Sequence, residues 1–234
     1  MLKERQKSIL DASIKEYIKT AKPVASKGLV RKYNLKLSPA TIRHELCELS
    51  ELGYLEQPHT SAGRIPTDRG YRFFVDGLDE DLHLTVLEEK LISAVFDIKD
   101  EEGFLRELGR IVSKISGTFT ATGFFEDETV YETGFSEILE EPEFRESGCA
   151  IEFGRLVDIL DSSLRGLLNE VKGDGEKIFI GKENPLLEAR SYSMLISSWS
   201  HPIGFDGFIA MVGPKRTNYA KHKALINRVK HNKS

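Results

Sequence analysis

The residues best suited to chemistry are polar side chains in the stretch around residues 38–47. Thr41, Arg43 and His44 fall opposite the apolar stripe of a predicted helix. An arginine guanidinium can donate two hydrogen bonds to guanine, and a threonine can bond a phosphate or contact a thymine methyl group. No carboxylate lies three or four residues from Arg43, so an ion pair along the helix does not account for it. This face is therefore a candidate for reading DNA bases.

A second polar group follows in the loop around Gly63. Its side chains are those of His59, Thr60, Ser61 and Arg64. Hydroxyls and backbone N–H groups bind phosphates, and an arginine at the tip of a loop can enter a minor groove. An ordinary polar hairpin loop has the same composition, but its place directly after the candidate helix favours DNA contact. Arg69, further along, is expected to add a phosphate contact.

The helix that positions the first group is predicted over residues 39–52. Ser38 is a good N-cap and Pro39 suits the first helical position, where a backbone N–H is not needed. Gly53 is placed to end the helix. The apolar stripe repeats at spacings of three and four through Ile42, Leu46, Leu49 and Leu52. We also count Ser38 among the candidate DNA-binding residues.

The surrounding elements predict a winged helix-turn-helix. Two helices are expected earlier, over residues 2–19 and 26–33. A short strand at 54–56 and a returning strand from 64–65 enclose the polar loop. In this arrangement the helix 39–52 is the recognition helix, which lies in the major groove, and residues 57–65 form the wing.

Composition and charge are those of a globular protein with one basic end. The 234 residues are 40% hydrophobic and 30% charged. Net charge is +5 over residues 1–78, −14 over 79–152 and +5 over 153–234. DNA binding would therefore depend on one localised face. No apolar run approaches the length of about 18 residues that a membrane span needs, and the N-terminus has no apolar signal segment. A cytoplasmic protein is expected.

Catalytic and metal-binding patterns are weak. Cys47 and Cys149 lie far apart without metal-like spacing and are expected to be reduced thiols. The serines near His201 could be imagined as a catalytic cluster, but a strand edge and turn explain them better. Trp199, the sole tryptophan, is expected in the core. We expect no enzyme activity, no cofactor and no metal.

The second half of the sequence predicts helices packed on an antiparallel sheet. Helices are expected over 85–97, 103–116, 151–168 and 218–231. Strands are expected over 119–125, 130–135, 178–180, 194–199 and 207–212, the last two forming a hairpin. An acidic linker is expected at 79–84, and a tight turn at Gly173-Asp-Gly.

The residues from Lys3 to Leu78 strongly resemble the DNA-binding domain of HrcA-type heat-inducible transcription repressors of bacteria. The segments that carry the resemblance are Glu4-Arg-Gln, Glu16-Tyr-Ile, Pro23-Val-Ala-Ser-Lys, Ser38-Pro-Ala-Thr-Ile-Arg, Leu49-x-x-Leu-Gly and Pro58-His-Thr-Ser-Ala-Gly-Arg-Ile-Pro-Thr-Asp-x-Gly-Tyr-Arg. The last is long and specific. The family pattern usually has Asn at the position of His44.

The resemblance continues in the second half. Leu139-Glu-Glu-Pro-Glu-Phe-Arg, Ile180-Gly-Lys-Glu-Asn-Pro and Gly207-Phe-Ile-Ala-Met-Val-Gly-Pro-Lys-Arg-Thr-Asn-Tyr-Ala are similar to the family's GAF-like regulatory domain. Family members are usually longer. The difference falls between Phe125 and Tyr131, where they carry further strands and an inserted helical region used in dimer contacts, so this chain is similar to a short form.

The resemblance implies an α+β protein with two domains. Residues 1–78 would be a winged-helix DNA-binding domain, and residues 79–234 a shortened GAF-like regulatory and dimerisation domain. The implied function is repression of heat-shock (chaperone) genes by a homodimer. It would bind an inverted-repeat CIRCE-type operator in double-stranded DNA, would be assisted by a GroEL-type chaperonin and would be released on heat stress. Two alternatives remain: a ligand-responsive winged-helix regulator, and a winged-helix protein–protein adaptor that does not bind DNA.

Overall fold

The chain divides into two compact units in a computed structural model. The units are Met1–Asp79 and Glu80–Ser234, and each is described here by itself. The structure describes residues 2–78, 83–127, 129–145, 147–169, 171 and 175–231. The predicted linker at 79–84 and the predicted turn at Gly173 therefore lie largely outside the described residues.

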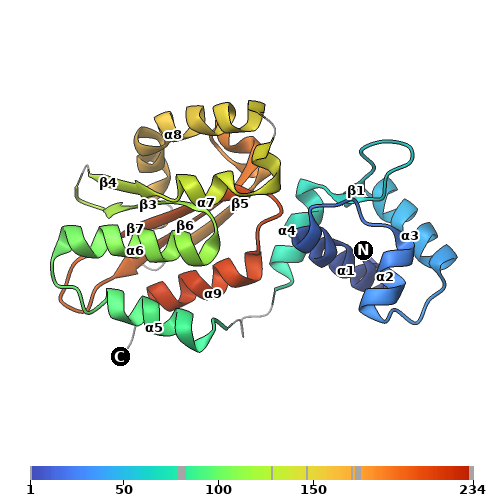
Figure 1. The fold of residues 1–234 in the computed structure, drawn as a ribbon, viewed down its shortest axis with the longest axis horizontal. Helices are drawn as coiled ribbons and strands as arrows, with labels where there is room; N and C mark the ends of the chain where they lie inside the picture. The colour runs from blue at the N-terminus through green and yellow to red at the C-terminus, as the bar shows by residue number, and fades with distance from the viewer. Residues whose placement is uncertain are drawn as a thin grey trace. The chain divides into compact units, whose positions relative to one another are not determined.

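The first unit consists of three helices, a small hairpin and a fourth helix. Its helices are α1 (Glu4–Thr20), α2 (Ser26–Tyr33), α3 (Pro39–Glu51) and α4 (Asp68–Asp76). Between α3 and α4 the short strands β1 (Leu55–Glu56) and β2 (Ile65–Pro66) pair antiparallel, with Leu55 opposite Pro66. Figure 1 shows the hairpin and its loop beside α3. The order and the approximate bounds of these elements agree with the sequence prediction.

Helix α3 begins and ends where its capping residues require. The Ser38 hydroxyl accepts a hydrogen bond from the Thr41 N–H at 3.1 Å, and Pro39 occupies the first turn. Gly53 then adopts φ +77°, a left-handed conformation that favours glycine. The helix buries Ile42, Leu46 and Leu49. Burial of each such side chain contributes about 1.5–3 kcal/mol, so the apolar stripe fixes which side of α3 faces inward.

The second unit is built on one antiparallel five-stranded sheet. The strands are β3 (Phe119–Phe124), β4 (Val130–Thr133), β5 (Glu176–Ile180), β6 (Tyr192–Ser200) and β7 (Asp206–Pro214). Their order across the sheet is β4-β3-β7-β6-β5. The predicted hairpin is the long central pair β6–β7, with Tyr192 opposite Pro214 and Ser200 opposite Asp206.

Helices cover both faces of this sheet (Figure 1). One face packs against α5 (Val86–Val95), α6 (Glu101–Ser116) and α9 (Tyr219–Lys230), and the other against α7 (Phe135–Leu139) and α8 (Ser147–Leu168). Each face of the sheet packs into its own hydrophobic core. Alternating residues of β6 pack into one core or the other, because successive side chains of a strand point to opposite faces. Leu195 and Trp199 join the first core, whereas Met194 and Ile196 join the second.

Several element boundaries of the second unit differ from the sequence prediction, among them those next to α7 and α8. The strand expected over 130–135 ends at Thr133, because Gly134 turns the chain with φ +90° and Phe135 begins α7. The long helix expected from residue 151 begins at Ser147. Apolar periodicity locates the buried part of a helix, but the first turn of α8 lies outside that pattern.

An ion-pair cluster joins two distant segments of the second unit. The Arg216 guanidinium donates to both carboxylate oxygens of Glu143, at 2.6 and 2.9 Å, and also pairs with Glu141. Glu141 and Glu143 belong to the segment 139–145, and Arg216 to the segment 207–220. Both segments carry the sequence resemblance, and this contact places them together.

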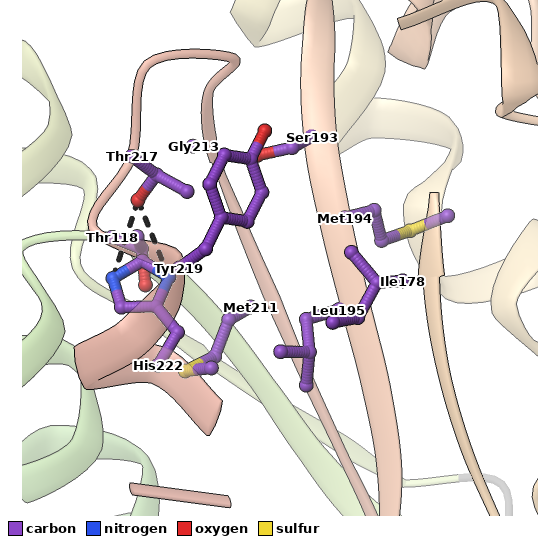
Figure 2. Close-up of a pocket in the computed structure, with 10 residues that line it drawn as sticks. All are labelled: Thr118, Ile178, Ser193, Met194, Leu195, Met211, Gly213, Thr217, Tyr219 and His222. Atoms are coloured by element: carbon purple, nitrogen blue, oxygen red, sulfur yellow. Dashed lines mark hydrogen bonds between the residues drawn. The ribbon is translucent and has the colours of Figure 1, made fainter. Parts of the chain in front are cut away.

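A small cavity lies beside the start of α9, next to the buried His222 (Figure 2). The His222 ring lies 3.2 Å from the Ser116 carbonyl oxygen and 3.2 Å from the Thr217 hydroxyl. Burial lowers the pKa of His222 to about 4. The cavity holds only about 10 Å³, which is room for about one water molecule.

We expect acid to destabilise the second unit through His222. The unfolded chain takes up a proton near pH 6.5, whereas the folded chain does so near pH 4, so stability falls as pH decreases between these values. The expected loss is about 3 kcal/mol. Urea titrations followed by the fluorescence of Trp199 at pH 7, 5.5 and 4.5 would measure it. His222→Gln should flatten this dependence, although burial of His201 lowers its pKa too and adds to the trend. If the free energy of unfolding of His222→Gln depends on pH as steeply as that of the unsubstituted chain, the loss of stability in acid does not come from His222.

Candidate nucleic-acid interface

The outward face of α3 carries the predicted base-reading side chains. Ala40, Arg43 and His44 are exposed, on the side opposite the buried stripe. Arg43 has no ion-pair partner among the described residues, so its guanidinium is available to a ligand. The hydroxyls of Ser38 and Thr41 lie 2.9 Å apart at the helix start, where Ser38 also serves as the N-cap.

The three glutamates of α3 do not all face outward. Glu45 is 1% exposed and forms an ion pair with Arg5 of α1. Glu48 accepts a hydrogen bond from Gln6 of α1 at 2.7 Å. Of the three glutamates, only Glu51 is exposed. The outward face of α3 is therefore less acidic than the sequence indicates.

The loop between β1 and β2, residues 57–64, presents the second predicted group. His59, Thr60 and Ser61 are exposed. The loop is braced by Gln57, whose side-chain N–H₂ donates to the carbonyls of Thr60 and Ala62, each at 2.9 Å. Sequence reasoning missed Gln57, because nothing in its spacing shows that its side chain reaches across its own loop.

Arg64 lies at the base of this loop rather than at its tip. Its backbone pairs with Val24, two residues before the start of α2, through hydrogen bonds of 2.8 and 2.9 Å. A Cβ atom on the neighbouring Gly63 would lie 2.4 Å from the Val24 carbonyl oxygen, so glycine is required for this approach. The half-buried Arg64 guanidinium reaches back to α3 and donates to the Cys47 sulfur at 3.6 Å. Arg64 was expected at the tip of the loop, but its side chain lies between the loop and α3.

A depression of about 250 Å³ joins these groups. Arg43 and Cys47 of α3 line one side, and Ser26 at the start of α2 lines another. The loop contributes Gln57 and residues 60–64. Two guanidinium groups, hydroxyls and backbone N–H groups thus surround one concave surface, a combination that suits a phosphate oxygen.

Arg69 is not brought together with these residues. Its guanidinium donates to the Leu52 carbonyl at 2.7 Å and lies 4.4 Å from the centre of the Tyr54 ring. Both contacts are at the C-terminal end of α3, whereas Ser38 and Thr41 are at the N-terminal end. A helix of this length spans roughly 20 Å, so Arg69 lies well away from the start of α3.

His44 is also exposed, and it has a partner on its own helix. Its Nε2 lies 3.0 Å from Glu48 Oε1, and its side chain remains 71% exposed. Glu48 therefore contacts both His44 and Gln6, which links the outward face of α3 to α1.

The residues considered for catalysis do not form a catalytic arrangement in the described part of the chain. Ser197 Oγ bonds the carbonyls of Gly175 and Ser198, at 3.4 and 3.1 Å. His201 stacks on Phe205, with ring centroids 4.3 Å apart. Trp199 is buried, as predicted, and donates to the Phe208 carbonyl. Within the described residues, no group of three metal-ligating side chains is found, and no helix could span a membrane.

Comparison of the sequence with curated proteins finds many relatives, and those most similar to this chain include proteins named heat-inducible transcription repressor HrcA. The Symbiobacterium thermophilum protein is 47% identical over 116 residues, which cover 49% of this chain and 34% of that protein. The Desulforamulus reducens protein is 42% identical over 144 residues, covering 62% of this chain and 37% of that protein. The chain thus spans only about a third of the length of these relatives.

Comparison of the structure finds a similar fold in a solved structure titled "Crystal structure of a hypothetical protein at 2.2 A resolution". The TM-score is 0.78 at 18% identity, covering 99% of this chain and 97% of that chain. This likeness concerns the fold alone. A family model described as the HrcA protein C terminal domain matches residues 77–222. That match extends over more than half of the chain, and the chain therefore belongs to the HrcA family.

Proposed function

We propose that this chain is a sequence-specific DNA-binding repressor. In this proposal residues 1–78 form a winged helix-turn-helix, with α3 as the recognition helix and the hairpin loop as the wing. The observation that carries it is the concave surface shared by Arg43, Arg64 and the loop hydroxyls, beside an outward face of α3 from which Glu45 is withdrawn into its ion pair with Arg5. Base edges would be read by Arg43, Thr41 and His44, and phosphates would be bound by Ser38 and the wing residues.

The charge distribution supports a localised interface. The first 78 residues carry a net charge of +5, while residues 79–152 carry −14. Phosphates would be attracted to the first unit and repelled by much of the second. We propose that residues 79–234, which include the second unit, are a shortened GAF-like regulatory and dimerisation domain rather than a DNA contact.

The names of the relatives indicate the biological setting. They are heat-inducible transcription repressors, and we propose the same activity here: a homodimer that binds a CIRCE-type inverted repeat at chaperone genes in the cytoplasm and is released on heat stress. A two-fold symmetric dimer matches an inverted repeat, because each copy reads one half-site. Assistance by a GroEL-type chaperonin belongs to the same proposal.

Two other functions fit the first unit less well. A ligand-responsive regulator needs a cavity for its effector. The cavity beside His222 in the second unit holds only about 10 Å³, and the larger hollows of the first unit, about 450 and 460 Å³, lie open at its surface. A protein–protein adaptor does not explain why Arg43 and Arg64 line one depression, since two cations side by side favour an anionic partner.

The proposed function is tested by titrating duplexes with the full chain at two salt concentrations. A CIRCE-like inverted repeat is compared with a scrambled duplex, and sedimentation gives the stoichiometry. Tight, sequence-selective binding by two chains per duplex, weakening steeply with salt, is the expected result. Weak, equal binding to both duplexes by a monomer would contradict the proposal.

Arg43 should determine the preference for one base. We expect Arg43→Ala to lower affinity for the specific site by about 1–3 kcal/mol and to relax selection at one position. Arg31, an exposed cation on α2 that does not line the shared depression, provides the matched control, Arg31→Ala. Competition titrations with single-position duplex variants measure both effects. Equal weakening on every sequence would instead make Arg43 a phosphate contact.

Arg64 should contribute affinity without selectivity. We expect Arg64→Ala to weaken binding to the inverted repeat and to random DNA alike, and to reduce the salt dependence by about one charge. Arg64→Lys keeps the charge but removes the flat guanidinium that reaches Cys47, so it separates charge from shape. Because Arg64 is half-buried, thermal unfolding of each variant should be measured in parallel. If the folded Arg64→Ala chain binds DNA with unchanged affinity, the wing is not part of the DNA interface.

A further inference from the structure

A chain of hydrogen bonds runs from the start of α1 to His44 on the outward face of α3. The Lys3 backbone N–H donates to Gln6 Oε1 at 3.1 Å, and Gln6 Nε2 donates to Glu48 Oε2 at 2.7 Å. The other oxygen of Glu48, Oε1, lies 3.0 Å from His44 Nε2. Gln6 is buried, so the position of Glu48 is determined by α1 as well as by its own helix.

This arrangement determines which atom of the imidazole can meet a base. An ionised carboxylate accepts hydrogen bonds and does not donate them, so the proton of a neutral His44 resides on Nε2, which donates to Glu48. Nδ1 is then an acceptor. When the imidazole gains a proton, Nδ1 becomes a donor while the contact between Nε2 and Glu48 is kept and strengthened by charge.

His44 lies in solvent, close to a charged group of its own helix. Its side chain is 71% exposed, and the carboxylate that faces it is that of Glu48. On α1 the nearby charged groups are Arg5, which is paired with Glu45, and Lys3. Arg43, the preceding residue, is exposed. Histidine is the side chain whose charge ordinarily changes between about pH 5 and 8.

We propose that His44 is a specificity-determining residue whose preference for a base is switched by one proton. Neutral His44 accepts a hydrogen bond from an exocyclic amino group, that of cytosine or adenine, in the major groove. Protonated His44 donates to N7 or O6 of guanine. Glu48 positions the ring through its contact with Nε2. This inference rests on the proposed function, because α3 must lie in a major groove for the switch to act.

The test is selection from a duplex library that is randomised across one half-site, using the full chain at about pH 5.5 and about pH 8. We expect one position to change from cytosine or adenine at high pH to guanine at low pH, with a change in relative affinity of about tenfold. His44→Asn should remove the pH dependence and select adenine at both values, since an amide pairs with adenine.

His59→Asn is the matched control, because His59 is an exposed histidine on the wing rather than on α3. It should retain the pH-dependent preference. The same base preference at both pH values, or a pH effect that is equal on all sequences, would overturn the assignment to His44 while leaving the repressor intact. Absence of sequence selection at any pH would contradict the proposed function itself.

Discussion

The attachment of α3 to α1 through two glutamates is the interaction on which the rest of the candidate interface depends. Glu45 is buried against Arg5, and its Oε2 atom has no hydrogen-bond partner among the described residues, so Arg5 compensates a carboxylate held away from water. Removing one partner of a buried ion pair typically costs about 3–5 kcal/mol. Gln6 binds Glu48 one turn later. These contacts fix the rotation of α3 and hold the Glu45 charge away from its outward face, while Glu48 lies between α1 and His44.

The wing depends on a second constraint, at its base. A hairpin with two residues in each strand has little stability of its own. The backbone pairing of Arg64 with Val24 joins it to the segment before α2, and the close approach at Gly63 makes this possible. Gln57 then holds the loop from inside. The loop and α3 thus belong to one rigid surface, which is the condition for recognising DNA with fixed geometry.

The local features of the fold could be predicted from the sequence. Ser38, Pro39 and Gly53 mark the ends of α3, and the apolar spacing identifies its buried side, because caps and periodicity depend on neighbours in the chain. The resemblance to HrcA repressors was confirmed by the family match. The strand order β4-β3-β7-β6-β5 was not predicted beyond the β6–β7 hairpin, because it depends on pairing between distant segments.

The site was less predictable for the same reason. Arg5, Gln6 and Gln57 act through side chains that reach other elements or cross a loop, and no local pattern reports this. The burial of Glu45 could not be inferred from the sequence, because its partner, Arg5, lies 40 positions earlier. Arg64 was expected at the tip of the wing, but its pairing with Val24 places it at the base. The contacts of Arg69 with the end of α3 could not be read from its spacing either.

The central claim is that α3 and the wing together form the surface that binds DNA. Hydrogen–deuterium exchange of the full chain, with and without a saturating CIRCE-like duplex, tests it most directly. The account predicts that the duplex slows exchange in the first turns of α3 and in residues 57–64, and that α8 is unaffected. Slowed exchange confined to residues 80–234, or none in α3 and the wing while the duplex is bound, would contradict it.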